Sequence, residues 1–289
     1  MTDHGVPSLP AVMYEEVVRG ALAEDLGRGG DLTTDAVVPA ASLSRGRVIS
    51  RAAGVVAGLA PGASVFQLLD PDLEVTFEVS DGDHVVAGSV LMTVSGRTRP
   101  ILTGERTALN LVGRLSGVAT LTRAFVDAVA GSGARVSCTR KTTPGLRTLE
   151  KYAVRCGGGT NHRFGLDDAV LVKDNHVAVA GSVRAAVERA RAAVGHTVIV
   201  EVEVDTLEQL GEALEVGADA VLLDNMNIDE LRRAVEMVGG RLVTEASGGI
   251  TLDTAAAAAA TGVDLLSIGA LTHSAPSLDL TLELDPTAG

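Results

Sequence analysis

Short apolar runs alternate with longer amphipathic stretches through the second half of this chain, and this alternation limits the folds available to it. The apolar runs have the length of strands and predict six of them, at residues 135–139, 169–173, 198–204, 220–224, 242–245 and 265–269. The stretches between the later runs predict helices at residues 182–194, 207–216, 229–238 and 252–260. Strands joined by helical crossovers lie parallel, and several such units in succession indicate an α/β barrel.

A different pattern precedes residue 115, where β-like runs are separated by Gly and Asp turns. The sequence predicts helices at residues 14–25 and 106–130, and strands at 47–50, 54–58, 74–79 and 89–94. We therefore expect a first domain at residues 1–115 and a barrel domain at residues 116–275. Residues 276–289 form a tail in which apolar and polar residues alternate, and we expect this tail to return as a strand to the first domain.

Composition favours a soluble, globular protein. The 289 residues are 46% hydrophobic, which is sufficient for a buried core. No apolar run approaches the roughly 20 residues that a membrane-spanning helix needs. The first ten residues lack the basic and apolar regions of a signal peptide, so we expect a cytoplasmic protein. Cys138 and Cys156 have neither metal-ligand nor disulfide spacing, which fits a reducing compartment.

Positive charge is concentrated in one segment of an otherwise acidic chain. The net charge is −13, which argues against nucleic acid or an anionic membrane as a partner. Residues 135–176 nevertheless carry eight Lys and Arg against four Asp and Glu, and all three lysines, Lys141, Lys151 and Lys173, fall there. Lys141 and Lys173 each stand at the end of an expected strand. This basic segment predicts a pocket for a small, highly charged anion.

Polar residues end the expected strands of the barrel. Ligands of β/α barrels bind at the C-terminal ends of the strands, and polar side chains buried there are costly unless they are paired. Ion pairs with one another would explain any single residue, whereas the whole set indicates a binding site. The residues are Arg140, Lys141, Lys173, Asp174, Asn175, Glu201, Glu203, Asp224, Asn225, Glu245, Ser247 and Gly269.

Two glycine-containing loops and a group of carboxylates add detail to this site. The loops follow the last two expected strands, where barrel enzymes commonly bind phosphate through backbone N–H groups. Glu201 and Asp224 end neighbouring strands and could share a divalent cation such as Mg²⁺. Glu203 lies on the same strand face as Glu201, so spacing leaves open which of the two faces the ligand. The loops are Ser247-Gly248-Gly249 and Ile268-Gly269-Ala270.

A dense set of longer motifs covers the basic segment and extends to both sides of it. The central motifs are TRKTTPGLR at residues 139–147, EKYAV at 150–154, GGG at 157–159, NHR at 161–163 and KDNH at 173–176. Further motifs are EDLG at 24–27, GDLTT at 30–34, ERTALN at 105–110, SGVAT at 116–120 and EVEV at 201–204. Over nearly its whole length, the chain resembles the quinolinate phosphoribosyltransferases, also called carboxylating nicotinate-nucleotide pyrophosphorylases.

The resemblance implies a fold, an assembly and a reaction. The fold would be the type II phosphoribosyltransferase architecture, with an N-terminal α/β sandwich domain and an incomplete α/β (TIM-like) barrel, in a homodimer. The reaction would be a pentosyl transfer from phosphoribosyl pyrophosphate to quinolinate with Mg²⁺. Its products would be nicotinate mononucleotide, pyrophosphate and CO₂, as a step of NAD biosynthesis.

The resemblance also implies roles for individual residues. Quinolinate would be bound by Arg106, Arg140, His162 and Arg163, with Arg106 contributed by the other subunit. Pyrophosphate would be neutralised by Lys141 and Lys173, and Thr139 would be a further substrate contact. Mg²⁺ would be held by Glu201 and Asp224, and the 5′-phosphate by the two glycine-containing loops.

Three alternatives remain open from the sequence. A lysine that ends a barrel strand, as Lys173 does, could form a Schiff base with a carbonyl substrate, as in a barrel lyase. A molybdenum-associated paralogue of the same family would carry much the same motifs. A non-catalytic phosphate-sensing barrel is the third alternative, and carboxylates opposite a basic cluster argue against it.

Overall fold

The computed structural model describes residues 6–286, and its chain divides into two compact units. The first unit comprises the chain up to Arg123, Thr142–Gly158, and the chain from Thr272 onward. The second unit comprises Ala124–Lys141 and Gly159–Leu271. Residues 1–5 and 287–289, at the ends of the expected first domain and tail, lie outside the described residues. The division differs from the expected boundary at residue 115, because one helix, α4 (Thr98–Ala128), runs through that position.

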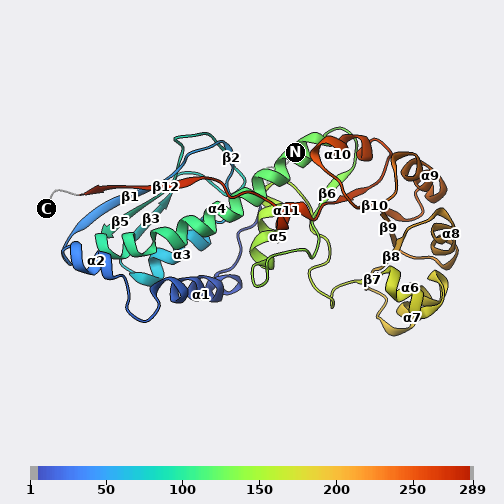
Figure 1. Ribbon diagram of the computed structural model, residues 1–289, viewed down its shortest axis with the longest axis horizontal. Coiled ribbons are helices and arrows are strands. Elements are labelled where there is room, and N and C mark those ends of the chain that lie inside the picture. The colour runs from blue at the N-terminus through green and yellow to red at the C-terminus, as the bar shows by residue number, and fades with distance from the viewer. Residues whose placement is uncertain (1–5, 287–289) are drawn as a thin grey trace. The chain divides into compact units, whose positions relative to one another are not determined.

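The first unit is built on a four-stranded antiparallel sheet in the order β12-β1-β5-β3 (Figure 1). Strand β12 pairs with β1 over seven positions, so the C-terminal segment completes the edge of this sheet. Strands β2 and β4 form a separate two-stranded antiparallel sheet. The strands are β1 (Leu43–Ser50), β2 (Gly54–Val55), β3 (Glu74–Phe77), β4 (His84–Val85), β5 (Val90–Arg97) and β12 (Leu280–Pro286).

Helices α3 and α4 pack against each other and against this sheet. A Cβ atom at Gly62 of α3 would overlap Val112 of α4 and lie 3.3 Å from the Met92 side chain of β5. Glycine is therefore required where the two helices and the sheet meet. The helices of this unit are η1 (Ala11–Met13), α1 (Glu15–Leu26), α2 (Leu32–Val37), α3 (Leu59–Leu69), α4 and α5 (Arg147–Cys156).

The second unit is an open parallel barrel. Its six strands lie in the order β6-β11-β10-β9-β8-β7, and no described pairing joins the end strands β6 and β7. In Figure 1 the helices α8, α9 and α10 lie on the outer side of the arc of strands. The strands are β6 (Arg135–Ser137), β7 (Val170–Val172), β8 (Val200–Val204), β9 (Ala220–Asp224), β10 (Val243–Ser247) and β11 (Leu265–Ser267). The helices are α6 (Asp174–Ala180), α7 (Val183–Ala193), α8 (Leu207–Val216), α9 (Ile228–Val238), α10 (Leu252–Ala259) and α11 (Ala270–His273).

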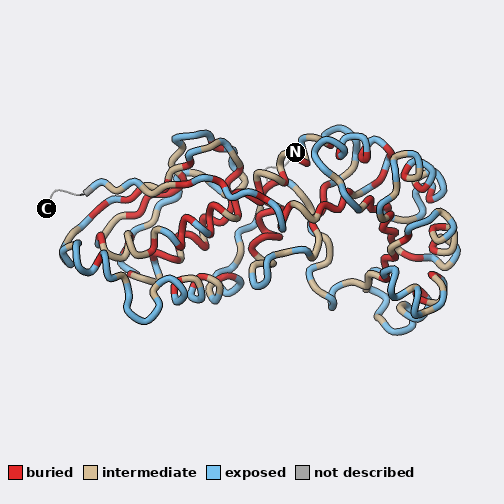
Figure 2. Tube along the Cα trace, in the orientation of Figure 1, coloured by how far each residue is buried: buried red, intermediate tan, exposed pale blue. Residues whose placement is uncertain are grey.

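The core of the second unit lies along its central strands (Figure 2). Strand β9 is buried from Ala220 to Leu223, and its last residue, Asp224, is partly exposed. Strand β8 has the sequence VEVEV, in which buried valines alternate with two glutamates. Because successive side chains of a strand point to opposite faces, the valines share one face and the glutamates the other. In the described part of the chain, no helix is both long and apolar enough to cross a membrane.

Candidate active site

A cavity of about 380 Å³ opens at the C-terminal ends of the barrel strands, entirely within the second unit. Its lining contains four cationic side chains, two carboxylates, one imidazole, three hydroxyls and two leucines. This composition suits a ligand that carries several negative charges and an apolar ring. The lining residues are Thr139, Arg140, Lys141, His162, Arg163, Leu171, Lys173, Glu203, Leu222, Asp224, Ser247 and Ser267.

Most of the residues expected at the site lie in this lining, and seven do not. Thr139, Arg140, Lys141, His162, Arg163, Lys173, Asp224 and Ser247 are brought together there. The residues outside the lining are Arg106, Glu201, Gly248, Gly249, Ile268, Gly269 and Ala270.

Lys173 is held at the start of a helix that follows β7 directly. Its backbone N–H donates to Nδ1 of His176 at 2.8 Å, which fixes the turn from strand to helix. Its ammonium Nζ lies 2.6 Å from Oε2 of Glu203 on the neighbouring strand β8. The Lys173 side chain is 48% exposed and that of Glu203 10%, so the pair stands at the mouth of the cavity. The ammonium can therefore meet a ligand anion while Glu203 keeps it in place.

Of the two glutamates of β8, Glu203 lines the cavity and Glu201 does not. Both glutamates lie on one face of β8, but two residues of a strand span about 6.6 Å. Glu201 is the deeper of the two and points to His162, whereas Glu203 reaches the cavity beside Asp224. The carboxylates in the cavity lining are thus those of Glu203 and Asp224, and the expected pairing of Glu201 with Asp224 at a metal stays a prediction.

Arg163 is partly buried in the wall of the cavity, close to a second guanidinium. Its Nη1 donates to the carbonyl oxygen of Ala169 at 3.0 Å, and its Nε is buried without a hydrogen bond. Burial, and next the positive charge of Arg140, lower the pKa of Arg163. Two guanidiniums held close together in a partly buried wall repel each other, and a dianionic ligand would relieve that repulsion.

Asp224 is oriented by the residue that follows it. The Nδ2 of Asn225 donates to Oδ2 of Asp224 at 2.6 Å, and the Asn225 backbone N–H donates to the carbonyl oxygen of Ser247 at 2.9 Å. Asn225 has a φ of 54°, which non-glycine residues seldom adopt. A Cβ atom at Gly248 would overlap the Asn225 amide, so Gly248 is required for this arrangement. The loop that begins at Ser247 after β10 therefore contacts the segment Asp224–Asn225 at the end of β9. We call these residues the corner between β9 and β10.

The loop after β11 contacts a neighbouring strand of the barrel, and its residues 268–270 do not line the cavity. The backbone N–H of Ile268 donates to the carbonyl oxygen of Ser137 at 2.9 Å, and the Ile268 side chain is buried. Ser267, the last residue of β11, supplies the hydroxyl that lines the cavity. Gly269 directly precedes α11, a helix of four residues that begins at Ala270.

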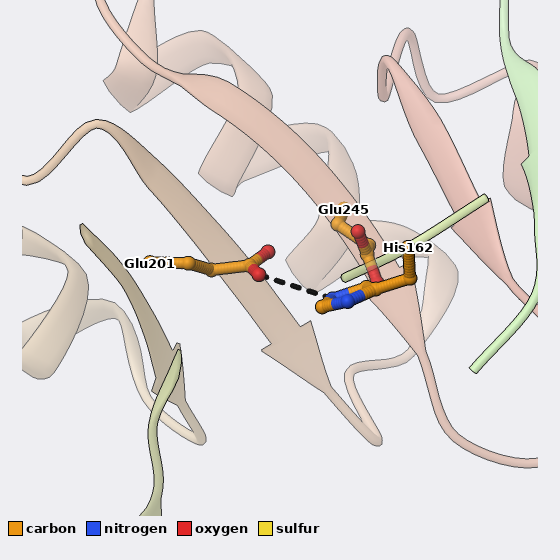
Figure 3. A group of neighbouring side chains, drawn as sticks. All are labelled: His162, Glu201 and Glu245. Atoms are coloured by element: carbon orange, nitrogen blue, oxygen red, sulfur yellow. Dashed lines mark ion pairs between the residues drawn. The ribbon is translucent and has the colours of Figure 1, made fainter. Parts of the chain in front are cut away.

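The side chain of His162, in the cavity lining, meets two buried glutamates, Glu201 and Glu245 (Figure 3). Nε2 of His162 lies 3.1 Å from Oε2 of Glu201 and 3.5 Å from Oε1 of Glu245. Nδ1 of His162 accepts the backbone N–H of Arg163 at 2.7 Å. One ligand atom from each of the three side chains lies within 4.8 Å of the others, so the group could also hold a metal ion. We call it the His162 triad.

Glu245 is the most deeply buried carboxylate of the His162 triad, and its Oε1 accepts no hydrogen bond. Burial and the negative charge of Glu201 raise the pKa of Glu245 to about 7, against the lowering effects of His162 and the Ser267 hydroxyl. Glu245 therefore holds a proton at neutral pH far more readily than an exposed glutamate does. A proton there reduces the negative charge beneath a pocket for anions.

Arg106 lies on α4 of the first unit, where it lines a separate cavity of about 380 Å³. Glu24, Asp25, Asn110 and Arg114 line the same cavity. Within one chain, the structure thus places Arg106 in a different cavity from the other expected quinolinate contacts.

Sequence reasoning left four features of the site undetected or undecided. It did not choose Glu203 over Glu201, and it did not identify Ser267 or the leucines of the cavity wall. The alternation of β8 contained the signal for the depth of each glutamate, once the end of the strand is fixed at Val204. No sequence signal joined His162 to Glu245, because 83 positions of the chain separate them and only the barrel brings them together.

An open parallel barrel with a cationic cavity at its C-terminal ends defines an α/β-barrel protein that binds a polyanionic small molecule. Comparison with known protein families agrees with this class and identifies a specific family. The model for the N-terminal domain of quinolinate phosphoribosyl transferase matches residues 31–116, and the model for its C-terminal domain matches residues 118–283. The chain therefore belongs to the quinolinate phosphoribosyl transferase family.

Individual relatives extend over almost the entire chain. The probable carboxylating nicotinate-nucleotide pyrophosphorylase of Bacillus subtilis is 44% identical over 261 residues, which is 90% of each chain. The carboxylating nicotinate-nucleotide pyrophosphorylase of Mycobacterium leprae is 47% identical over 274 residues, 93% of this chain and 96% of the relative. The crystal structure of NadC from Streptococcus pyogenes superimposes with a TM-score of 0.94 at 38% identity, covering 98% of this chain and 100% of that one. The expected fold class is confirmed.

Proposed function

We propose that this chain transfers the phosphoribosyl group of phosphoribosyl pyrophosphate to quinolinate and releases CO₂, giving nicotinate mononucleotide and pyrophosphate for NAD biosynthesis. The observation that carries this proposal is the cavity in which Arg140, Lys141, Arg163 and Lys173 converge at the strand ends of a barrel of this family. Both substrates are polyanions, and four cations around one cavity attract them electrostatically.

The cations divide into two types that suit the two substrates. Guanidiniums are planar and bind carboxylates through two parallel hydrogen bonds, so Arg140 and Arg163 are the groups for the quinolinate carboxylates. Ammoniums act as compact point charges, which suits Lys141 and Lys173 to the pyrophosphate that leaves. Leu171 and Leu222 supply the apolar wall that an aromatic ring needs.

A Mg²⁺ ion fits the carboxylates of the cavity. Mg²⁺ is typically bound by one or two carboxylates together with substrate phosphates, and Glu203 and Asp224 both line the cavity. Asn225 orients the Asp224 carboxylate and Lys173 holds that of Glu203. Mg²⁺ would neutralise charge on the pyrophosphate group. Ser247 and the loop that follows it provide hydroxyl and backbone N–H groups for the 5′-phosphate.

The chemistry requires charge stabilisation and positioning more than proton transfer. The pyridine nitrogen attacks the ribose carbon as pyrophosphate leaves, and Lys141 and Lys173 balance the negative charge that develops on the leaving group. Once the ring nitrogen is bonded to ribose, the ring is positively charged. The positive ring nitrogen then stabilises the electron pair that remains on the adjacent ring carbon when the carboxylate leaves as CO₂, and a proton from solvent bonds to that carbon to complete the product.

We further propose a homodimer in the cytoplasm, in which Arg106 of one subunit reaches the substrate cavity of its partner. The family resemblance supports this arrangement, and so does the position of Arg106 in a cavity of the first unit that shares no lining residue with the substrate cavity of the barrel. A third guanidinium would then complete the binding of the two quinolinate carboxylates.

Release of ¹⁴CO₂ from carboxyl-labelled quinolinate tests the reaction. We expect release only when phosphoribosyl pyrophosphate is present, with nicotinate mononucleotide formed in equal amount. Nicotinate has a single carboxylate and should be a very poor substrate, because the guanidiniums would be left partly uncompensated. Comparable kcat/KM values for nicotinate and quinolinate would contradict the assignment of the cavity to a dicarboxylate.

A Schiff base on Lys173 is disfavoured by the geometry. Its Nζ forms an ion pair with a carboxylate oxygen of Glu203 at 2.6 Å and its side chain is 48% exposed, whereas lysines that form Schiff bases are activated by an apolar pocket or by a second cation. Borohydride treatment with a carbonyl substrate should therefore leave no adduct on this chain.

A further inference from the structure

A short loop, residues 163–169, joins Arg163 in the cavity wall to strand β7. No residue of this loop is buried, and its larger apolar residues, Phe164 and Leu166, are exposed. A surface loop of this kind keeps its conformation mainly through hydrogen bonds, because it has little buried apolar area. The polar contacts of the loop therefore decide where its backbone places Arg163.

Two side chains brace the loop in opposite directions. The carboxylate of Asp168 accepts the backbone N–H of Phe164 at 2.5 Å through Oδ2 and that of Gly165 at 2.8 Å through Oδ1. In the other direction, Nη1 of Arg163 donates to the carbonyl oxygen of Ala169 at 3.0 Å. Both oxygens of Asp168 are thus bonded to the two residues that directly follow Arg163.

We propose that Asp168 is a positioning residue for quinolinate binding: its carboxylate fixes the backbone after Arg163 and so holds the Arg163 guanidinium in the substrate cavity. This inference rests on the proposed function, which assigns Arg163 to a quinolinate carboxylate. Asp168 is not part of the cavity lining, so it acts on the substrate through Arg163.

The far end of the loop is anchored in the barrel. The backbone N–H of Val170 donates to the carbonyl oxygen of Ile199 at 2.9 Å, and β7 pairs in parallel with β8 from Val170 to Val172. Asp168 stands two residues before Val170. Its hydrogen bonds therefore connect the backbone that follows Arg163 to the start of a paired strand.

The charge of Asp168 strengthens this connection. Burial opposes its ionisation, but the hydrogen bonds from Phe164 and Gly165 outweigh that effect and lower the pKa of Asp168, so the carboxylate is charged at neutral pH. Hydrogen bonds to an ionised acceptor are roughly twice as strong as those between neutral groups. Burial and the charge of Arg140 lower the pKa of Arg163, and the charge of Asp168 opposes both. Asp168 thus favours the charged guanidinium as well as its position.

The sign of a substitution's effect separates positioning from simple electrostatics. A carboxylate near a cavity for anions repels them, so its removal should strengthen anion binding. If Asp168 positions Arg163, its removal should weaken quinolinate binding instead. Asp167 is the matched control, because it is the adjacent exposed carboxylate of the same loop and accepts neither of the two N–H groups that Asp168 binds.

Calorimetric titration of the full-length enzyme tests this difference. Asp168→Ala should weaken quinolinate binding about tenfold, as for the loss of hydrogen bonds to a charged group. Asp167→Ala should leave quinolinate affinity unchanged or slightly increased. Affinity for phosphoribosyl pyrophosphate should be retained in both variants, because Arg163 is assigned to the other substrate. Unchanged or tighter quinolinate binding in Asp168→Ala would overturn the proposal. An equal loss for both substrates would indicate a general structural role and would also overturn it.

A double-mutant cycle tests whether Asp168 acts through Arg163. Arg163→Ala alone should weaken quinolinate binding about 100-fold. The double variant should bind no more weakly than Arg163→Ala, because no guanidinium remains to be positioned. A total loss of about 1000-fold would show that Asp168 acts independently of Arg163 and would contradict the proposal. Asp168→Asn retains one oxygen acceptor and replaces Asp168→Ala in the cycle if the alanine variant unfolds.

Amide hydrogen exchange tests the loop itself, without any substrate. The amides of Phe164 and Gly165 should exchange faster in Asp168→Ala than in the wild type, and at the wild-type rate in Asp167→Ala. Wild-type enzyme that binds no quinolinate would contradict the proposed function. Exchange that Asp168→Ala leaves unchanged would contradict the bracing of the loop by Asp168, whichever substrate the enzyme binds.

Discussion

At the scale of single residues, the shape of a cation decides what it can do as much as its charge does. Lys173 is held 2.6 Å from Glu203 at the mouth of the cavity, with its ammonium facing the space where pyrophosphate would lie. A guanidinium at this position would be wider and would direct its donors in a fixed plane. Under the proposed function, a lysine therefore suits this position better than an arginine.

Lys173→Arg should lower kcat at least about tenfold although it conserves the charge, because the wider group cannot occupy the same position beside the leaving group. Steady-state kinetics with both substrates measure this. Arg184→Lys is a matched control, since Arg184 and Glu215 also form an exposed ion pair at 2.6 Å but lie away from the cavity lining. Near-normal kcat in Lys173→Arg would contradict the role of a point charge. Lys151 is not a suitable control, because its side chain is buried in α5.

Glu245 makes the stability of the fold depend on pH. Its pKa of about 7 in the folded state lies above the value of an unfolded chain, so its proton stabilises the fold. That contribution is fully present below about pH 4 and is lost as the pH rises through 7, a change of about 3 kcal/mol. Glu245→Gln cannot lose a proton. We expect its stability relative to wild type to increase between pH 5 and pH 8, as measured by urea denaturation.

The control for this prediction is Glu236→Gln, which changes an exposed glutamate of α9. Its stability relative to wild type should be the same at both pH values. A constant difference for Glu245→Gln as well would mean that Glu245 is ionised throughout the range, and the triad would then carry more negative charge than we infer.

At the scale of elements, the corner between β9 and β10 depends on one close approach. Gly248 has a φ of 98°, and a Cβ atom there would overlap the Asn225 amide that orients Asp224. Gly181, at the end of α6, has the same φ of 98° but open space around it. Alanine substitutions at the two glycines therefore separate two free-energy costs. Gly181→Ala introduces backbone strain alone, whereas Gly248→Ala adds a steric clash.

Gly181→Ala should lower the free energy of unfolding by about 1 kcal/mol, through backbone strain alone. Gly248→Ala should lower it further and should also raise KM for phosphoribosyl pyrophosphate at least about tenfold, because the corner carries both Asp224 and the loop that we propose binds the 5′-phosphate. Denaturation and steady-state kinetics on both variants measure these effects. Equal KM values in the two variants would mean that the corner does not contact that substrate.

Elements formed by local pattern could be predicted, and elements that depend on distant partners could not. Strand β9 was expected at residues 220–224 and helix α8 at 207–216, and both form there. Helix α3 was not expected, because Pro61 and Gly62 stand in its first turn. The first N–H of α3, that of Leu59, donates to Asp81 at 3.1 Å, a partner 22 positions away. Helix α5 was missed because it buries Glu150, whose charge is balanced by Arg114 of α4 at 2.8 Å.

The same distinction applies to the site. The basic motifs and strand ends located the cavity, because the ends of parallel strands meet wherever the barrel forms. The depth of Glu201 below Glu203 and the meeting of His162 with Glu245 depend on where each strand ends and on how the barrel curves. Neither follows from spacing along the chain.

At the scale of the whole molecule, neither unit is one continuous piece of chain. The chain passes from one unit to the other after Arg123, Lys141, Gly158 and Leu271. The first unit needs α5 for the buried pair of Arg114 with Glu150, and it needs β12 to complete its sheet. A boundary at residue 115 would remove both.

A fragment of residues 1–115 should therefore fail to fold cooperatively. It would leave the Arg114 guanidinium without its carboxylate and expose the edge of β1. Circular dichroism and urea denaturation should show no sharp transition for the fragment under conditions in which the full chain unfolds cooperatively. A sharp transition would mean that the segments after residue 115 are dispensable for this sheet.

The assembly can be tested with two inactive variants, because a site shared between subunits can be reconstructed from them. Arg106→Ala leaves the barrel cavity intact, and Arg140→Ala leaves Arg106 intact. In a mixed dimer, one site would have both arginines and the other would have neither. With random exchange at equal concentrations, about half of the dimers are mixed, so roughly a quarter of wild-type activity should return in a closed two-fold assembly. Each variant alone must be nearly inactive, and a tagged subunit must show that exchange has occurred. If exchange occurs and no activity returns, Arg106 does not act across the interface, and the proposed shared site is wrong.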